Sequence, residues 1–257
     1  MRLEAILFDL DGTLVDSAGD LRDALNALLA EEGLAPLDLQ GVKGMVGDGV
    51  AKLVARGLTA RGAGLDRLPA RVARFMELYE PNAARLTRPY PQVAETLESL
   101  RTRSLRLAVV TNKPHAVTMR ILEALDLARF FDAVVGGDTL SRRKPDPTPL
   151  LHAMRALDAA PAETLMVGDN HHDVAAARAA GVPVAVVAYG YGRRPAAELG
   201  ADRVLDSFAA LRRLVDGPES RDAQVPSTDA VQPASASRRS RLTSASFRPD
   251  RAGTWKE

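Results

Sequence analysis

The 257-residue sequence contains no cysteine. That absence excludes disulfide bonds, thiolate metal sites and a cysteine nucleophile, and it favours a reducing compartment. No apolar run approaches the roughly 18 residues that a transmembrane helix needs, and the run of four apolar residues before Asp9 is too short for a signal peptide. We therefore expect a cytoplasmic protein with no membrane partner.

The sequence also lacks an excess of charge of either sign. Its 34 basic and 33 acidic side chains leave a formal net charge of +1, so no overall field favours nucleic acid as a partner. With 46% hydrophobic and 26% charged residues, the composition is ordinary for a globular protein whose length allows a large core and a small second domain. A monomer and a homodimer are both compatible with this composition.

Two carboxylates follow the first apolar run of the chain. Residues 5–8 have the pattern of a short buried strand, and Asp9, Asp11 and Gly12 come directly after it. Because residues i and i+2 of a strand share a face, Asp9 and Asp11 converge on one small volume, where their charges repel unless a cation or a shared proton relieves them. The pattern predicts an active site at the carboxyl end of a strand. A simple polar turn is the alternative for the Asp-Gly pair taken alone.

Residues 15–86 carry helical patterns and no predicted strand. The first helix runs from an N-cap at Asp16 or Ser17 to a closing Gly33, and two more are expected over 49–61 and 68–86. We predict that this block is an all-helical insertion that lies as a lid over the carboxyl edge of a sheet.

From residue 88 onward, strands alternate with helices. The strands are expected at 105–110, 133–135, 164–167, 182–187 and 203–205, and the helices at 93–103, 116–125, 148–157, 173–180 and 208–215. This alternation predicts a doubly wound, mainly parallel α/β sheet, which the first strand must join to bury its apolar residues. We expect a core domain of residues 1–14 and 87–215, a helical domain of 15–86 and a disordered tail of 216–257, where apolar residues are few.

Polar side chains follow three further strands of the predicted sheet. They are Thr111 with Asn112, Lys144, and Asp169 with Asp173. Because the carboxyl ends of parallel strands meet at one edge, we expect these side chains to lie beside Asp9 and Asp11. Four carboxylates around one small volume suit a hard cation that prefers oxygen ligands, and they predict a Mg²⁺ site. Each cluster taken alone is also compatible with a helix cap, an exposed charge or a turn.

A phosphate monoester suits such a site. In-line attack by Asp9 forms an aspartyl phosphate, and Asp11 is placed to protonate the leaving alkoxide and then to deprotonate the incoming water. Mg²⁺ and Lys144 neutralise the phosphoryl oxygens, and Thr111 donates a hydrogen bond to one of them. The other side chains expected at the substrate are Thr13 and Asn112.

The histidines are poorly placed for a softer metal. His115 and His152 fall inside or at the start of predicted helices. His171 and His172 lie in the expected loop after Asp169, within reach of the mouth of the site but without a predicted ligand role.

Four segments resemble, in order, the four motifs of the haloacid dehalogenase superfamily. They are residues 9–13, 111–113, 144–145 and 168–173. The resemblance implies a Rossmann-like core with the helical insertion as a C1 cap. It implies that Asp9 is the nucleophile and a metal ligand, and that Asp11 is the acid and base and binds Mg²⁺ through its backbone carbonyl. It further implies a metal-bound Asp169 with Asp173 behind it, while Asn170 departs from the small hydroxyl residue common in the family.

Residues 47–58 of the insertion and 189–192 are similar to the phosphoglycolate phosphatases. This resemblance implies a phosphatase that hydrolyses a small phosphorylated metabolite, 2-phosphoglycolate. Lys43, Asp48 and Arg56 are the candidates to contact its carboxylate or to shape the loop, with solvated surface as the alternative. Other substrates stay open, namely a sugar phosphate, N-acetylmuramic acid 6-phosphate, a nucleotide or pyrophosphate, and so does a phosphomutase of the same fold. Asp11 argues against a dehalogenase, which does not need to protonate an alkoxide.

Overall fold

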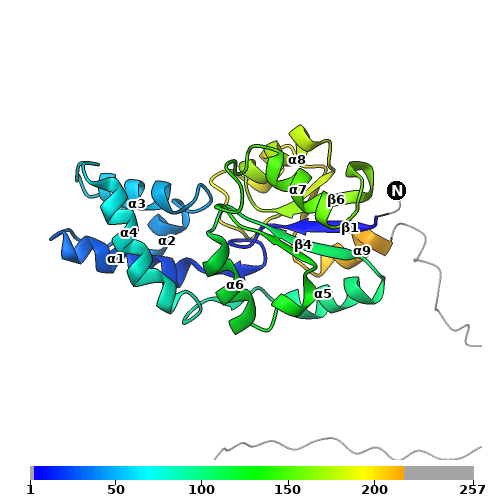
Figure 1. The fold of residues 1–257 in the computed structure, drawn as a ribbon, viewed down its shortest axis with the longest axis horizontal. Coiled ribbons are helices and arrows are strands. Elements are labelled where there is room, and N and C mark those ends of the chain that lie inside the picture. The colour runs from blue at the N-terminus through cyan, green and yellow to red at the C-terminus, as the bar shows by residue number, and fades with distance from the viewer. Residues whose placement is uncertain (1–2, 217–257) are drawn as a thin grey trace, which may run out of the picture. The chain divides into compact units, whose positions relative to one another are not determined.

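The computed structural model of the protein describes residues 3–216. Within them, six parallel strands form one sheet in the order β5–β4–β1–β6–β7–β8 (Figure 1). The strands are β1 (Ala5–Phe8), β4 (Arg106–Val110), β5 (Ala133–Val135), β6 (Thr164–Gly168), β7 (Val184–Val187) and β8 (Arg203–Leu205). The predicted doubly wound parallel sheet is therefore confirmed, and β1 lies near its centre.

The side chains of β1 alternate between two apolar layers. Ile6 and Phe8 belong to the layer that contains α5, α6 and α9, whereas Ala5 and Leu7 belong to the layer that contains α7 and α8 on the opposite face (Figure 1). The helices are α5 (Val93–Thr102), α6 (His115–Ala124), α7 (Thr148–Ala156), α8 (His171–Ala180) and α9 (Ala210–Asp216). Because all four β1 side chains are fully buried, this strand anchors both layers and fixes the position of the residues that follow it.

Four α-helices lie between β1 and α5 in the chain. They are α1 (Ala18–Glu31), α2 (Leu39–Lys43), α3 (Val50–Thr59) and α4 (Leu68–Tyr79). In Figure 1 this helical insertion lies beyond the carboxyl end of β1. The third predicted helix is shorter than expected, because the chain tightens after Tyr79 into a 3-10 turn, Glu80–Asn82, that contains Pro81. Proline lacks the N–H that a continuing α-helix would need.

The prediction of no strand in the insertion block is wrong at its first residues. The two-residue strands β2 (Val15–Asp16) and β3 (Arg88–Pro89) pair in antiparallel fashion and join the two chain ends of the insertion. A two-residue strand has too little alternation to be recognised, and its partner lies far along the chain.

Asp20 fastens the same two ends of the insertion together. Its buried carboxylate accepts hydrogen bonds from the backbone N–H groups of Leu86 (2.9 Å) and Thr87 (2.8 Å) and from the Thr87 hydroxyl (2.8 Å). A carboxylate with three donors is well compensated for its burial. This contact fixes the start of α1 against the chain that leads back to the core.

Replacing Asp20 by alanine is expected to lower the free energy of unfolding by about 2–4 kcal/mol, because it leaves buried N–H groups without acceptors. Chemical denaturation measures the change. The matched control is Asp23→Ala, whose carboxylate pairs with Arg85 at 34% exposure and should cost less than about 1 kcal/mol. Equal losses in the two variants would contradict the assigned role of Asp20.

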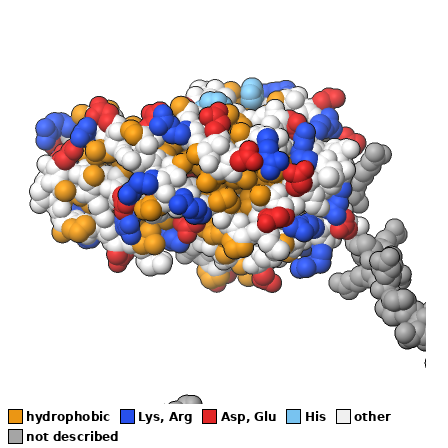
Figure 2. Space-filling model, turned by 90° about the horizontal axis from the view of Figure 1, so that it is seen from below, with side chains coloured by type: hydrophobic (Ala, Val, Ile, Leu, Met, Phe, Trp, Pro, Cys, Tyr) orange, Lys and Arg blue, Asp and Glu red, His pale blue; other side chains and the backbone are white. Residues whose placement is uncertain are grey.

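The C-terminal part of the prediction is only partly covered by the structure. The predicted tail lies outside the described residues, except that Asp216 ends α9 and its carboxylate lies 2.9 Å from Arg103. Among residues 3–216, no helix has the length and apolar character needed to cross a membrane. The face of these residues shown in Figure 2 intersperses basic and acidic side chains, as the balanced composition predicts.

Candidate functional site

The candidate site lies where the strand order of the sheet changes direction. From β1, the chain builds the sheet toward β4 and β5 on one side and toward β6, β7 and β8 on the other. The register pairs Phe8 with Val109 and also with Val167. Asp9 therefore leaves the sheet level with the loops that follow β4 and β6, at the position where doubly wound folds bind ligands.

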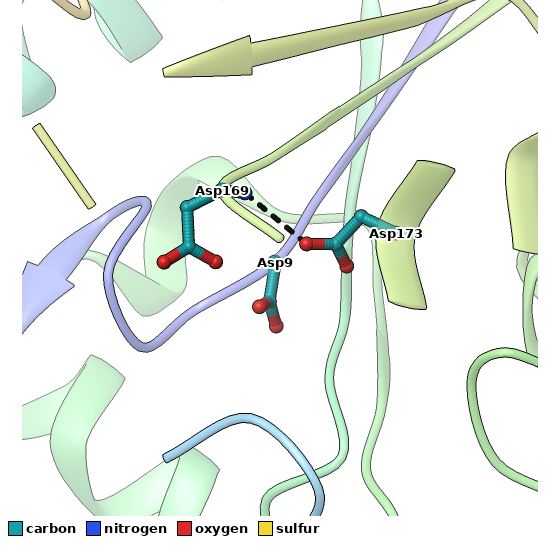
Figure 3. Close-up of side chains that lie close together, drawn as sticks. All are labelled: Asp9, Asp169 and Asp173. Carbon is teal, nitrogen blue, oxygen red and sulfur yellow. Dashed lines mark hydrogen bonds between the residues drawn. The ribbon is translucent and has the colours of Figure 1, made fainter. Parts of the chain in front are cut away.

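Three buried carboxylates meet at this edge. One oxygen each of Asp9, Asp169 and Asp173 lies within 4.8 Å of the others (Figure 3). Burial raises the pKa of Asp9 to about 6, against the opposing effect of Lys144. Burial, together with the charges of Asp173 and Asp9, raises the pKa of Asp169 well above its usual value. Such crowding of carboxylates favours the binding of a cation.

Lys144 compensates part of this negative charge. Its buried ammonium lies 3.0 Å from Oδ1 of Asp9 and 2.6 Å from Oδ1 of Asp173. Burial lowers the pKa of Lys144, but the two carboxylates outweigh that effect and hold the pKa above its ordinary value. The second oxygen of Asp173 accepts from the backbone N–H groups of Asp169 (3.1 Å) and Asn170 (3.2 Å). Asp173 thus positions both the lysine and the loop.

Asp169 lies in a close-fitting backbone cradle. Its carboxylate accepts from the N–H of Tyr191 (2.6 Å) and from the side-chain amide of Asn170 (2.8 Å). A Cβ atom added to Gly12 would lie 2.3 Å from Oδ2 of Asp169, and one added to Gly190 would lie 2.3 Å from Cβ of Asp169. Gly12 also has a φ of +85°, which favours glycine. These glycines let two backbone segments approach the carboxylate closely.

The donor set around the cluster fits a hard divalent cation. Among the described residues, the cluster that could hold a metal ion contains carboxylates and no histidine, and the chain has no cysteine. Asp173 is already occupied by Lys144 and two N–H groups, so Asp9 and Asp169 have the oxygens best placed for a metal ion. Oxygen-only ligand sets are typical of Mg²⁺.

Asp11 has partners that the sequence did not reveal. Both of its carboxylate oxygens lie 3.0 Å from the ammonium of Lys113, and the hydroxyl of Ser17 donates to Oδ1 at 2.5 Å. Ser17 occupies the N-cap position of α1, as one of the two predicted residues, but its hydroxyl is turned to Asp11 and not to a helix N–H group, while Asp16 accepts from the N–H of Ala18. Only the position of Lys113 beside Thr111 and Asn112 in the sequence hinted at its role.

The Lys113 ammonium is enclosed. It is 3% exposed and lies 4.9 Å from the centre of the Tyr79 ring on α4. Burial lowers the pKa of Lys113, but the Asp11 carboxylate reverses this effect and raises the pKa. The lysine is therefore positively charged at neutral pH and joins the core to the helical insertion.

The remaining predicted site residues of the core also lie at the sheet edge. Thr111 is buried, and its hydroxyl accepts from the N–H of Lys113 at 3.3 Å. Asn112 donates from its amide to the carbonyls of Gly47 (3.0 Å) and Lys144 (2.9 Å), and so links the insertion to the loop after β5. Thr13 is fully buried, and its hydroxyl has no hydrogen-bond partner among the described residues.

The three predicted residues of the insertion are held by ion pairs. Lys43 lies 3.0 Å from Asp16, and Arg56 contacts Asp48 at 2.5 Å while it donates to the carbonyl of Met45 at 2.8 Å. These contacts hold the loop before α3 in one shape, with each cation already paired to a carboxylate of the chain.

Asp48 also reaches across to the core. Its carboxylate contacts the ring of His172 and lies 3.0 Å from the guanidinium of Arg193, which in turn donates to the carbonyl of Gly44 at 2.7 Å. His171 and His172 are not in a loop as predicted, because Asn170 caps α8 directly and both histidines form its first turn. The contact between Asp48 and His172 joins segments 124 residues apart, a distance beyond the reach of local sequence patterns.

A small cavity of about 30 Å³ lies between the helical insertion and the sheet edge. Its polar wall contains Asp9, Asp11 and Lys113, and its apolar wall contains Leu21, Val46, Val50, Leu53 and Tyr79. The first two carboxylates after β1 therefore face the same cavity. Lys43, Asp48 and Arg56 are not among the residues that line it.

Comparisons with known proteins agree with this fold. A family model described as haloacid dehalogenase-like hydrolase matches residues 6–187. A phosphoglycolate phosphatase from Rhodospirillum rubrum is 48% identical over 222 residues, which cover 84% of this chain and 92% of that protein. A phosphoglycolate phosphatase from Nitrosospira multiformis is 43% identical over 220 residues, which cover 83% of this chain and 96% of that protein.

Solved structures show the same similarity. The crystal structure of a predicted phosphoglycolate phosphatase from Haemophilus somnus has a TM-score of 0.79 at 32% identity and covers 83% of this chain and 98% of that one. That of CbbY from Rhodobacter sphaeroides, in complex with phosphate, has a TM-score of 0.70 at 28% identity and covers 82% and 96%. The resemblance noted from the sequence motifs is confirmed.

Proposed function

The chain belongs to the haloacid dehalogenase-like hydrolases, and on that premise we propose that it is a Mg²⁺-dependent phosphatase that converts 2-phosphoglycolate to glycolate and phosphate. The observation that carries the proposal is the shared cavity of Asp9 and Asp11, each paired with its own buried lysine. The substrate rests on the phosphoglycolate phosphatases to which the chain is similar over most of its length.

Mg²⁺ would be held by Asp9 and Asp169, with the backbone carbonyl of Asp11 as a further ligand. When bound, the ion supplies positive charge that neutralises the phosphoryl oxygens and orients the ester. Two further residues hold these ligands in position. Asp173 holds Lys144, which pairs with Asp9. The backbone N–H of Tyr191 donates to the carboxylate of Asp169.

In the first step, a carboxylate oxygen of Asp9 attacks phosphorus, and the bond from phosphorus to the glycolate oxygen breaks. With a pKa raised to about 6, Asp9 is mostly ionised at neutral pH and able to act as the nucleophile. Asp11 donates its proton to the departing alkoxide, so that glycolate leaves as a neutral alcohol group. Lys144 and the Thr111 hydroxyl stabilise the charge on the phosphoryl group.

In the second step, water attacks the phosphorus of the aspartyl phosphate. Asp11, now ionised, accepts a proton from this water, the bond between phosphorus and Asp9 breaks, and phosphate leaves with Asp9 restored. We propose that residues 15–86 act as a cap that shields the first step from water. The contacts of Asp48 with His172 and Arg193 support this role, because they tie the cap to the core beside the cavity.

Gly190→Ala is expected to weaken Mg²⁺ binding by roughly 10- to 100-fold, because the added Cβ displaces Asp169 from its cradle. Calorimetry, or the rise of Tm on adding Mg²⁺, measures the affinity without relying on turnover. Gly44→Ala is the control, since a Cβ there would lie no closer than 3.6 Å to its nearest neighbour. A folded Gly190→Ala protein with unchanged Mg²⁺ affinity would contradict the assignment of Asp169.

The substrate is tested by kcat/KM across a panel of phosphate esters. The panel contains 2-phosphoglycolate, a sugar phosphate, N-acetylmuramic acid 6-phosphate, a nucleoside monophosphate and pyrophosphate. We expect 2-phosphoglycolate to rank first by at least roughly 10-fold. If another ester ranks far above it, the proposed substrate is wrong while the phosphatase chemistry stands. Transfer of phosphate to a second hydroxyl of a sugar phosphate would instead indicate a phosphomutase.

A further inference from the structure

Lys113 and Lys144 hold different positions at the cavity. Lys144 lies between Asp9 and Asp173 and is committed to two carboxylates. Lys113 lines the cavity, and among the described residues its ammonium forms an ion pair with Asp11 alone. Lys113 is therefore a buried cation that faces the cavity beside Asp11.

The cations of the insertion are not available to a substrate in the same way. Lys43 is paired with Asp16, and Arg56 with Asp48 and the Met45 carbonyl. Neither residue lines the cavity. A substrate carboxylate that enters the cavity would meet apolar side chains on the insertion side, and an anion placed there without a cation would be strongly disfavoured.

The ammonium of Lys113 has room for a further anionic partner. It is 3% exposed, and both of its hydrogen bonds to described residues go to the carboxylate of Asp11. An ammonium has three N–H donors, so one donor is left for an anion in the cavity that Lys113 and Asp11 both line. A buried ammonium gains from a further charge-assisted hydrogen bond of this kind.

We propose that Lys113 binds the carboxylate of the substrate and thereby selects phosphate esters that carry a carboxylate next to the ester carbon. This inference rests on the proposed function. In 2-phosphoglycolate the carboxylate carbon is two covalent bonds from the ester oxygen. Asp11 is the proposed acid that protonates this ester oxygen, and the Lys113 ammonium lies 3.0 Å from both carboxylate oxygens of Asp11. The ammonium is therefore close to the position expected for the substrate carboxylate. The Tyr79 ring, 4.9 Å away, supports the ammonium from the insertion side.

The test uses ligands that do not react, so that an effect on Asp11 chemistry does not enter. The ligand 3-phosphonopropionate keeps the carboxylate and replaces the ester oxygen of 2-phosphoglycolate by a methylene group. Propylphosphonate is the matched ligand in which a methyl group replaces the carboxylate. Their Kd values with the full-length protein and Mg²⁺ are measured by calorimetry. We expect the wild type to prefer 3-phosphonopropionate by roughly 10- to 100-fold, as for one charge-assisted contact.

Lys113→Met should reduce this preference to less than roughly 3-fold, while Lys43→Met, which removes a lysine of the insertion, should retain it. If methionine disturbs the fold, Lys113→Gln is the second variant. Binding of inorganic phosphate in the presence of Mg²⁺ is the control that shows whether each variant keeps its phosphoryl site. A preference that persists in both Lys113 variants would overturn the role of Lys113 and leave the proposed substrate standing. No preference in the wild type would overturn carboxylate recognition, and with it 2-phosphoglycolate.

Discussion

Asp9→Asn is expected to lower kcat for phosphate-ester hydrolysis by roughly 10⁴-fold or more, because an amide oxygen cannot form the aspartyl phosphate. Stability should not fall with activity. Burial raises the pKa of Asp9 from 3.8 to about 6. As the pH rises from about 4 to above 6, Asp9 ionises less readily in the folded protein than in the unfolded chain, so its ionisation lowers the free energy of unfolding. Removing the charge should leave the free energy of unfolding at pH 7 unchanged or higher when EDTA is present.

Urea denaturation of Asp9→Asn at pH 7 and at pH 5 checks the sign of this effect. Any gain over the wild type should shrink at pH 5, where Asp9 in the wild type is largely protonated. Asp66→Asn, on a carboxylate with 73% exposure, is the surface control and should change neither turnover nor stability. Appreciable Mg²⁺-dependent activity in Asp9→Asn would contradict its role as the nucleophile.

Lys144→Met is expected to lower the free energy of unfolding by roughly 3–5 kcal/mol at pH 7, because it leaves Asp9 and Asp173 buried without their cation. The pKa of Lys144 is raised above 10.5, so its stabilising contribution is fully present at pH 7 and is lost only as the pH rises through the raised pKa. Activity should fall as well, because the phosphoryl group loses a positive neighbour.

The measurement is denaturation in EDTA, so that no divalent cation replaces the missing charge. Lys52→Met on the exposed side of α3 is the matched control and should change the free energy by less than about 0.5 kcal/mol. The loss in Lys144→Met should become smaller toward acidic pH, as the two carboxylates take up protons. A stability equal to that of the control would mean that this ion pair does not hold the site together.

The core and the cluster of polar side chains at its edge were predictable because the decisive patterns are local. Four consecutive apolar residues before Asp9 indicate a buried strand, and the alternation of strands and helices after residue 88 requires a parallel sheet. Parallel strands bring their carboxyl ends to one edge, so the sequence pattern is sufficient to place Asp169 and Lys144 beside Asp9. In these cases topology alone determines which residues meet.

The contacts that remained hidden depend on side-chain direction across long sequence distances. Ser17 has the pattern of a helix cap, yet its hydroxyl turns to Asp11 because the chain bends sharply after β1. Asp48 meets His172 and Arg193 only once the insertion has packed on the core. The hydrogen bond from the N–H of Tyr191 to Asp169 is donated by a backbone atom, so the type of residue at position 191 does not reveal it. Local patterns contain no information on such contacts.

Trapping the phosphorylated enzyme tests the central claim most directly. Asp11→Asn is mixed with Mg²⁺ and p-nitrophenyl phosphate, whose leaving group needs no proton, then quenched in acid and analysed by peptide mass spectrometry. We predict a burst of nitrophenolate and a phosphoryl group on the peptide that contains Asp9, because attack proceeds while the base for hydrolysis is missing. A burst with the phosphoryl group on another residue, or turnover with no phosphorylated enzyme, would contradict the account.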